Sequence, residues 1–413
     1  MNPINKNSSV QDANSSEGAS NTTTGWRGRQ ITSKPKSSLI TTITGAFQRV
    51  LSSLKRILKQ IFSPFHKISK KNASVRMINP EQKVEQTATE PPVPENGINI
   101  GLPNGGNTCW FNSAMKLMAS TSLFDNMLEA RSNDSADQKQ VRDALRKLIF
   151  TLRSGKGPGV IVREDYTKVL DAMKPIPIHG NNIAERNQAD PTEFLIQLQD
   201  YLGFEQPKKS GLKFVKNYQL RGSDDIEKFQ KFGTCTDEET FMLTLDIPNQ
   251  IEKNELLSLH RLIEPTDEVE VRPDVADDQN NRLFTRTWRL ASLPDEFLVY
   301  LKRWNVEGEK INNRIELNGS GEFEFTLCDP KKDEEGNIIG ETPREKTVRY
   351  RMAGSIDHRG FSLHGGHYVA NLRTPKGPVC HNDAVINSIE SKDFGANGFL
   401  LLLKKVQDED ADA

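Results

Sequence analysis

Residues 101–112 read Gly-Leu-Pro-Asn-Gly-Gly-Asn-Thr-Cys-Trp-Phe-Asn, a turn rich in glycine and asparagine that leads into Cys109. Apolar residues recur at helical spacing over 108–120, which predicts that a helix begins at about this cysteine. The positive end of the helix dipole favours the thiolate form of a thiol placed there, and the thiolate is the nucleophilic form. Taken alone, Cys109 is more simply interpreted as a buried structural cysteine.

A cysteine nucleophile needs a general base, and the base needs a third group that fixes its orientation. Two segments far downstream contain such residues: 358–368 reads His-Arg-Gly-Phe-Ser-Leu-His-Gly-Gly-His-Tyr, and 379–385 reads Val-Cys-His-Asn-Asp-Ala-Val. Their distance along the chain is no obstacle, because such partners meet only in the folded protein. His367 is the candidate base and His364 its rival. We expect the other histidines to lie in loops or to support the site: His358, His364 and His381.

Together these segments resemble the Cys box and the His box of the ubiquitin-specific proteases, a papain-like superfamily. Residues 101–113, GLPNGGNTCWFNS, are similar to the family pattern GLxNxGNTCYxNS, with Trp110 where tyrosine is usual. Residues 364–373 resemble the GHY strand, and residues 381–385 resemble the turn that follows it. Two further stretches match the QxDxxEF helix and the LPxxLxxxLKRF strand in the family's order: residues 188–194 and 293–304.

The resemblance implies a mechanism and a role for each matching residue. Cys109 matches the nucleophile, His367 the general base and Asn382 the residue that orients the base. Asp383 matches an adjacent acid that supports the site, and Asn104 matches the side chain that helps to form the oxyanion hole. The implied reaction hydrolyses the isopeptide or peptide bond after the C-terminal glycine of ubiquitin through an acyl-enzyme thioester on Cys109, and it needs no cofactor.

The resemblance also implies two groups of substrate-binding residues. Gln188, Asp190 and Glu193 match a helix whose acids meet the arginines of ubiquitin's tail. The alternative for these acids is a solvated helix face, or charges favoured by the helix dipole. The second group would line a narrow channel that admits only Gly-Gly: Gly365, Gly366 and Tyr368.

The order of the predicted elements favours an α+β fold, because helical patterns come first and strands follow. Helices are predicted over 108–120, 137–154 and 188–202. Strands are predicted over 241–247, 284–290, 296–303, 347–356, 366–373 and 398–405. The resemblance implies that these elements form a papain-like fold with a helical thumb, a β-rich palm and fingers.

The fingers are where the sequence departs from the family. Many members hold their fingers together with a four-cysteine zinc site, whereas this chain has only Cys235 in the corresponding region. The stretch between Glu205 and Phe241 is also short. We therefore predict reduced fingers and no structural metal.

The chain before the catalytic domain has a different composition. Residues 1–38 are rich in Ser, Asn, Thr and Gly, which predicts disorder. Residues 39–66 carry apolar residues at helical spacing among basic ones, which predicts a basic amphipathic helix. Its apolar stripe, over 39–65, suits a membrane surface as well as it suits packing on the catalytic domain or on a protein partner. The other predicted segments are a linker over 67–97, a catalytic domain over 98–406 and an acidic tail over 407–413.

Charge and cysteine content limit the partners and the compartment. Residues 1–100 carry 14 Lys and Arg against 6 Asp and Glu, so the remainder of the chain is acidic. An acidic body argues against nucleic acid and favours a basic ligand such as the tail of ubiquitin. Four widely spaced cysteines without a CxxC pair indicate a reducing compartment. The sequence has neither an apolar run of ~20 residues nor an apolar start, so we expect no spanning helix and no signal peptide.

The sequence leaves three functions open: an active deubiquitinase, a catalytically silent ubiquitin-binding scaffold and a protease of another ubiquitin-like modifier. The filled catalytic positions argue against the scaffold, whereas the sequence discriminates poorly between the modifiers. The polar start, the basic helix and the compact zinc-free domain would also suit a bacterial effector delivered into a host cell. That origin is a hypothesis, because no residue pattern states the organism.

Overall fold

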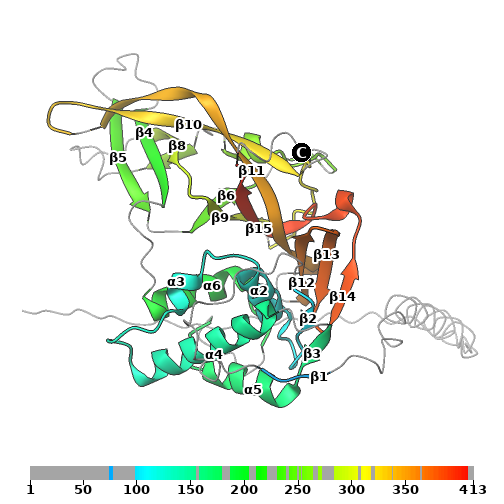
Figure 1. Ribbon diagram of the computed structural model, residues 1–413. Coiled ribbons are helices and arrows are strands. Elements are labelled where there is room, and N and C mark those ends of the chain that lie inside the picture. The colour runs from blue at the N-terminus through cyan, green and yellow to red at the C-terminus, as the bar shows by residue number, and fades with distance from the viewer. Residues whose placement is uncertain are drawn as a thin grey trace, which may run out of the picture. The chain divides into compact units, whose positions relative to one another are not determined.

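The structure is a computed structural model (Figure 1), and the chain divides into two units, Met1–Lys70 and Lys71–Ala413. All described residues belong to the second unit: 74–77, 98–154, 158–178, 187–203, 211–220, 230–238, 241–248, 251–252, 254–263, 268–271, 283–305, 308–317, 321–336, 338–362 and 365–407. The predicted disordered start, the amphipathic helix over 39–66 and almost all of the acidic tail lie outside the described residues.

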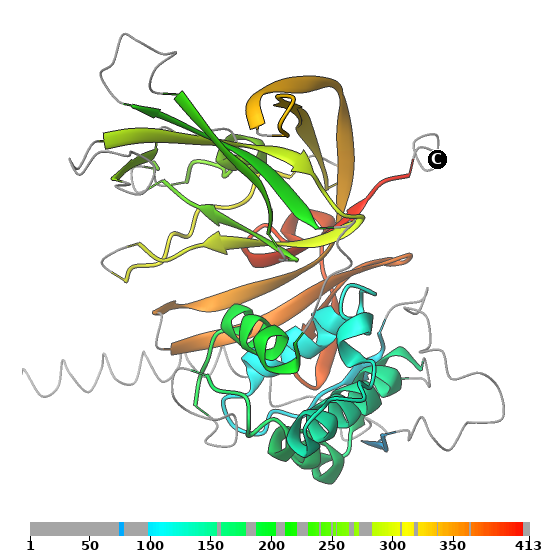
Figure 2. The same ribbon diagram turned by 90° about the vertical axis from the view of Figure 1, so that its left-hand side faces the viewer.

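Helices gather on one side of strands β11 and β12 in Figures 1 and 2. They are α2 (Cys109–Ala119), α3 (Asp125–Leu128), α4 (Ala136–Arg153), α5 (Arg163–Ala172) and α6 (Pro191–Leu202). The sequence predicts three of them, α2, α4 and α6, and gives no prediction for α5. In the described part of the chain, no helix has the length and apolar character needed to cross a membrane.

Local sequence signals set the ends of the two longest helices. Ser135 and Gln138 form a reciprocal capping box at the start of α4. Asp190 caps α6 and Pro191 occupies its first turn, so the helix starts a little later than the 188–202 prediction. Gly203 ends α6 in the left-handed conformation, at φ 63°.

The main sheet has eight strands in the order β14-β13-β12-β11-β15-β9-β6, with β10 paired to β11. Every pair is antiparallel except β6 with β9, which is parallel. The strands are β6 (Met242–Asp246), β9 (Glu296–Lys302), β10 (Glu322–Lys332), β11 (Ile338–Ser362), β12 (Gly365–Thr374), β13 (Gly377–Asn382), β14 (Val385–Ser388) and β15 (Gly398–Lys405).

The central strand β15 explains the continuous leucine run at 400–403. Leu400 and Leu402 belong to the core that the helices share with the sheet, while Leu401 and Leu403 belong to a second core on the other face. A strand buried on both faces requires apolar residues at every position rather than at alternate ones. The sheet therefore separates the helical layer, which carries Cys109, from the second core.

A second, antiparallel sheet occupies the region predicted as the fingers. Its order is β5-β4-β8-β7. The short helix α8 (Leu259–Ile263) contacts β6 and β10 of the main sheet. Its strands are β4 (Leu212–Leu220), β5 (Gln230–Glu238), β7 (Glu268–Val271) and β8 (Leu283–Ser292). No group of three His, Cys, Asp or Glu residues suited to a metal occurs in the described residues, which do not include the side chain of Cys235. A metal-free finger region stays a prediction.

A small parallel sheet joins the start of the unit to the cysteine region. It has the order β1-β3-β2, with β1 at Ser74–Val75, β3 at Gly159–Ile161 and β2 at Ile100–Gly101. The predicted linker over 67–97 therefore contains a short paired strand. The reason is that Val75 and Met77 pack against the helical core, whereas the Pro/Glu-rich part of that linker comes later.

Lys116 is a buried basic residue inside this architecture. Its side chain lies on α2 and is 1% exposed, and its ammonium group donates to the backbone oxygen of Ile100. Burial lowers the pKa of Lys116 to about 7. Burial, and then the nearby Lys116, lower the pKa of His381 on β13. The interior between α2, β2 and β13 therefore disfavours positive charge.

Lys116→Met is expected to change how stability depends on pH. Between about pH 7 and the ordinary lysine pKa of about 10.4, the unfolded chain holds a proton on Lys116 that the folded protein releases. The free energy of unfolding should then rise with pH in this window, by up to about 1.4 kcal/mol per pH unit. Below about pH 7 both states are protonated and this contribution to the slope disappears.

Urea unfolding of the wild type and Lys116→Met at pH 7.5, 8.5 and 9.5 measures the difference. We expect the variant to lack the rise that the wild type shows. Parallel curves for the two proteins would mean that Lys116 stays charged in the fold.

Candidate active site

Cys109 is the first residue of α2 and is 4% exposed. The residues before it, 102–108, form a turn that we call the cysteine loop. The amide oxygen of Asn104 accepts the backbone N–H of Gly106 at 2.9 Å, and the hydroxyl of Thr108 accepts that of Gly105 at 2.9 Å. Side chains that bond their own turn replace the missing regular backbone bonds. The loop thus delivers the thiol to a helix start, as the glycine and asparagine content predicts.

His367 on β12 lies beside this thiol. Nε2 of His367 is 2.6 Å from Oδ1 of Asn382. An amide oxygen can only accept, so Nε2 carries a proton and Nδ1 is left for the thiol. The hydrogen bond with Cys109 raises the pKa of His367 most strongly, burial opposes it, and the bond to Asn382 adds to the rise. The three residues therefore form a connected row of thiol, imidazole and amide.

Asp383 ties the row to the cysteine loop. One of its carboxylate oxygens accepts from Nδ2 of Asn104 at 2.9 Å, and the other accepts from Nδ2 of Asn112 at 2.7 Å. The oxygen bonded to Asn104 lies 4.0 Å from Nε2 of His367. The backbone oxygen of Asp383 also accepts the N–H of Leu102 at 3.0 Å. Every residue predicted to be catalytic is thereby brought into one cluster.

Two further residues, Asn112 and Tyr166, hold Asp383 in place through hydrogen bonds. The hydroxyl of Tyr166 donates to Oδ1 of Asn112 at 2.6 Å, which fixes the amide with its nitrogen toward Asp383. Asn112 ends the segment 101–112 that contains Cys109, but the sequence alone assigns it no role. Tyr166 lies on α5, in no recognisable motif, and no sequence signal points to it.

Asn104 can still serve as an oxyanion donor. Its amide nitrogen carries two N–H groups, of which one bonds Asp383. The geometry leaves the second N–H for another acceptor. Arg163 fixes the backbone of the loop, because its Nη2 donates to the backbone oxygen of Asn104 at 3.2 Å. The oxyanion role of Asn104 stays a prediction.

The predicted tail-binding acids lie at the start of α6, close to the sheet. Asp190 accepts the backbone N–H groups of Thr192 at 2.6 Å and Glu193 at 3.4 Å. Burial raises the pKa of Asp190 to about 6. Burial, and then the charge of Asp190, raise the pKa values of Tyr300 and Tyr368 on the facing strands. A cation bound here would favour the charged carboxylate of Asp190.

Other contacts hold this helix start in place. Nε1 of Trp110 donates to the backbone oxygen of Asn187 at 3.2 Å, so the tryptophan that replaces the usual tyrosine anchors the chain before α6. Gln188 lies next to this anchor and is half-buried, as is Glu193. The structure places all three predicted binding residues of this segment together, and their binding role stays a prediction.

The glycines before His367 are in two different environments. A Cβ added to Gly366 would lie 2.1 Å from Nε2 of His358, whereas one added to Gly365 meets nothing within 4 Å. Burial lowers the pKa of His358 to about 4, with Lys310 and then His367 adding to the effect. His358 is therefore neutral at physiological pH and fills the space that the missing side chain of Gly366 leaves.

Tyr368 is 3% exposed, and its ring packs between those of His358 and Phe399, with centroids 4.8 and 5.9 Å away. Its place as a channel lining residue stays a prediction. His364, the rival base, lies outside the described residues.

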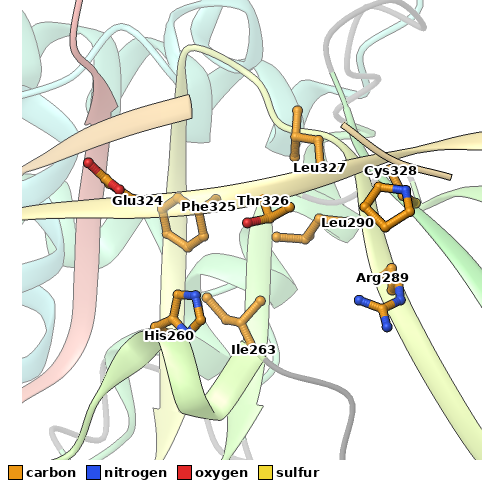
Figure 3. Close-up of a pocket in the computed structure, with 10 residues that line it drawn as sticks. His260, Ile263, Arg289, Leu290, Glu324, Phe325, Thr326, Leu327 and Cys328 are labelled. Atoms are coloured by element: carbon orange, nitrogen blue, oxygen red, sulfur yellow. The ribbon is translucent and has the colours of Figure 1, made fainter. Parts of the chain in front are cut away.

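A separate cavity of about 160 Å³ lies between α8, β8 and β10 (Figure 3). Apolar side chains such as Ile263, Leu290 and Phe325 line it, together with the polar His260 and Arg289. None of the residues predicted for catalysis or substrate binding lines this cavity.

Comparison with known proteins places the site in a family context. The model of the family "Ubiquitin carboxyl-terminal hydrolase" matches residues 100–411. The chain is 23% identical over 315 residues to Ubiquitin carboxyl-terminal hydrolase 25 of Arabidopsis thaliana, covering 71% of this chain and 45% of that protein. It is 23% identical over 338 residues to Ubiquitin carboxyl-terminal hydrolase 24 of Homo sapiens, covering 71% and 12%. The chain thus spans less than half the length of these relatives.

Solved structures resemble the fold. The structure of the SAGA Ubp8/Sgf11/Sus1/Sgf73 DUB module bound to ubiquitin aldehyde matches with a TM-score of 0.52 and 17% identity, covering 79% of this chain and 72% of that one. A structure of the module bound to monoubiquitin matches with a TM-score of 0.51 and 15% identity, covering 85% and 75%. At these identities the similarity shows a shared α+β fold.

Gly366→Ala is expected to destabilise the protein, because the new methyl group would overlap the ring of His358. Overpacking of this kind costs about 1–3 kcal/mol. Gly365→Ala is the matched control, with an expected change within about 0.5 kcal/mol. Urea unfolding of both variants and of the Gly366→Ala, His358→Ala double variant gives the measurement.

Removal of the His358 ring should restore part of the stability lost in Gly366→Ala. Equal stability of the two single variants would contradict the close approach of strand and ring.

Proposed function

The chain belongs to the ubiquitin carboxyl-terminal hydrolase family, and on that basis we propose that it is a deubiquitinase of the cysteine type. It would hydrolyse the peptide or isopeptide bond after the C-terminal glycine of ubiquitin. The single observation that carries the proposal is the placement of His367, whose Nε2 lies 2.6 Å from the amide oxygen of Asn382 and whose pKa is raised most strongly by Cys109. A nucleophile, a base and an orienting group are the parts that thiol-dependent acyl transfer requires.

In the first half of the reaction, Nδ1 of His367 takes the proton of Cys109 and the sulfur attacks the glycine carbonyl. The imidazolium formed is stabilised by the amide oxygen of Asn382 and by Asp383, 4.0 Å away. The free N–H of Asn104, with a backbone N–H at the start of α2, would donate to the developing oxyanion. The ring then gives its proton to the leaving lysine amine, and the acyl group remains on sulfur as a thioester.

In the second half, His367 takes a proton from water, and the resulting hydroxide attacks the thioester carbonyl. The tetrahedral intermediate collapses with loss of the thiolate of Cys109, which is reprotonated through the ring. The ubiquitin chain leaves with a free carboxylate. Because Nε2 stays bonded to Asn382 throughout, the ring keeps the orientation that both proton transfers need.

Ubiquitin is the proposed substrate because related proteins are named for its hydrolysis and the two structural neighbours are bound to ubiquitin or its aldehyde. The carboxylates of Asp190 and Glu193 would meet the arginines of its tail. A cation beside Asp190 would offset the burial that raises the pKa of this acid. A catalytically silent scaffold and a protease of another ubiquitin-like modifier are the alternatives.

Membrane association through residues 39–65 and delivery into a host cell as a bacterial effector are further proposals. The first rests on the composition of the N-terminal region, and the second on that region together with the compact catalytic domain predicted without zinc.

Cys109→Ala should lower hydrolysis of a fluorogenic ubiquitin substrate by at least about 10³-fold, because the variant retains no nucleophile. Binding of ubiquitin should persist, since no tail-binding residue is altered. Cys328→Ala is the matched control, because Cys328 is a buried cysteine on β10, outside the cluster around His367.

Propargylated ubiquitin and propargylated ubiquitin-like modifiers give the second readout, as covalent adducts on the intact chain. We expect an adduct with ubiquitin in the wild type and in Cys328→Ala. An unreactive wild type would favour the scaffold, and reaction with another modifier alone would favour the alternative protease.

A further inference from the structure

We propose that the strand segment 74–77 is a positioning element for the active site, acting through α5 on the cysteine loop. The inference rests on the proposed function and concerns residues that lie before the 100–411 match to the family. Figure 1 shows β1 beside β3 and α5, at the side of the unit where β2 leads into α2. Two routes of contacts run from this segment to Cys109.

The segment is attached to β3 by parallel pairing. Ser74 pairs with Val160 and Val75 with Ile161. The backbone oxygen of Val75 also accepts the N–H of Val162 at 3.0 Å. The side chains of Val75 and Met77 pack against the helical core. The pairing therefore fixes the backbone of this segment, and the packing fixes the side chains of Val75 and Met77.

The two residues after β1 hold the first turn of α5. Nη1 of Arg76 donates to Glu164 at 3.1 Å and to Asp165 at 3.4 Å. The backbone N–H of Met77 donates to the other carboxylate oxygen of Asp165 at 3.2 Å. The side chain of Asp165 is 12% exposed, so this carboxylate is a more effective anchor than the exposed Glu164.

The first route to the site runs through α5, whose inner face supports the cysteine loop. Arg163 donates to the backbone oxygen of Asn104 at 3.2 Å, and Tyr166 donates to Asn112 at 2.6 Å. A Cβ on Gly105 would lie 3.1 Å from Leu170 and 3.3 Å from Tyr166, so the loop backbone rests directly on these side chains. A shift of the first turn of α5 would therefore move both the cysteine loop and the first turn of α2.

The second route runs through β3 to β2. Ile100 pairs with Gly159 and Gly101 with Val160. A Cβ on Gly101 would lie 2.5 Å from the backbone oxygen of Ala384, and the next residue, Leu102, donates to Asp383. Strand β3 thus pairs with β1 on one edge and with β2 on the other. Strand β2 in turn leads to Leu102, which bonds Asp383. The two routes converge on Asn104 and Asp383.

None of the residues in segment 74–77 is among those predicted to touch ubiquitin, which separates positioning from binding. Loss of the segment's contacts should lower kcat while leaving KM nearly unchanged. A merely structural strand would instead change the free energy of unfolding and leave kcat unchanged in the folded fraction.

Arg76→Glu in the full-length chain tests the proposal, because it places like charges beside Glu164 and Asp165. We expect kcat for a fluorogenic ubiquitin substrate to fall about 10-fold with KM within about two-fold. Arg76→Lys should keep kcat within about two-fold, and the charge exchange Arg76→Glu, Glu164→Arg should recover part of the loss. Arg344→Glu is the matched control, since it reverses an exposed arginine paired with Asp329, away from the site.

The rate of Cys109 alkylation by chloroacetamide and hydrogen exchange over residues 100–112 are measured on the same variants. Both need no ubiquitin, so they report on positioning even if the proposed substrate is wrong. We expect Arg76→Glu, and not Arg344→Glu, to change the alkylation rate and to speed exchange in the loop. Unchanged kcat, alkylation and exchange in folded Arg76→Glu would overturn the proposal, as would equal losses in both reversals.

Discussion

The carboxylate of Asp383 holds the active site together, because it bonds the amides of Asn104 in the cysteine loop and Asn112 on α2. The thiol and the imidazole come from different elements, α2 and β12, and the turn after β13 bonds both α2 and the loop that precedes it. A polar network of this kind is stable when every member is satisfied and costly when one is lost. The close approach of Gly101 to Ala384 shows that the backbone itself is shaped for this contact.

Environment separates the roles of the three described histidines in this region. His358 and His381 are buried, and within the described residues their ring nitrogens have no hydrogen-bond partner. Burial lowers the pKa values of both, so both stay neutral. His367 instead has the thiol on one side and Asn382 on the other, and its pKa is raised. Hydrogen bonding and desolvation thus push chemically identical rings toward opposite roles.

The local sequence pattern predicted the helices and strands that carry the motifs. The residues and strands that depend on contacts between distant parts of the chain could not be predicted in this way. Helices α2, α4 and α6 follow from apolar spacing, and the start of α6 could have been placed from Asp190 and Pro191. Tyr166 could not be identified from the sequence, because its role depends on a hydrogen bond to Asn112 that forms only in the folded protein. Strand β1 is too short to show a period, and its partners lie far along the chain. The motif residues were found in sequence, whereas the bonds of Asp383 required the structure.

The contact between Cys109 and His367 can be tested by titrating the imidazole of His367 by NMR in the wild type and in Cys109→Ala. The bond to the thiol is the largest cause of the raised pKa, so the pKa should be lower in the variant than in the wild type. His381 serves as an internal reference, because burial and Lys116, and not His367, lower its pKa. Identical titration of His367 in the two proteins would contradict the account, since it would mean that the ring does not sense the thiol.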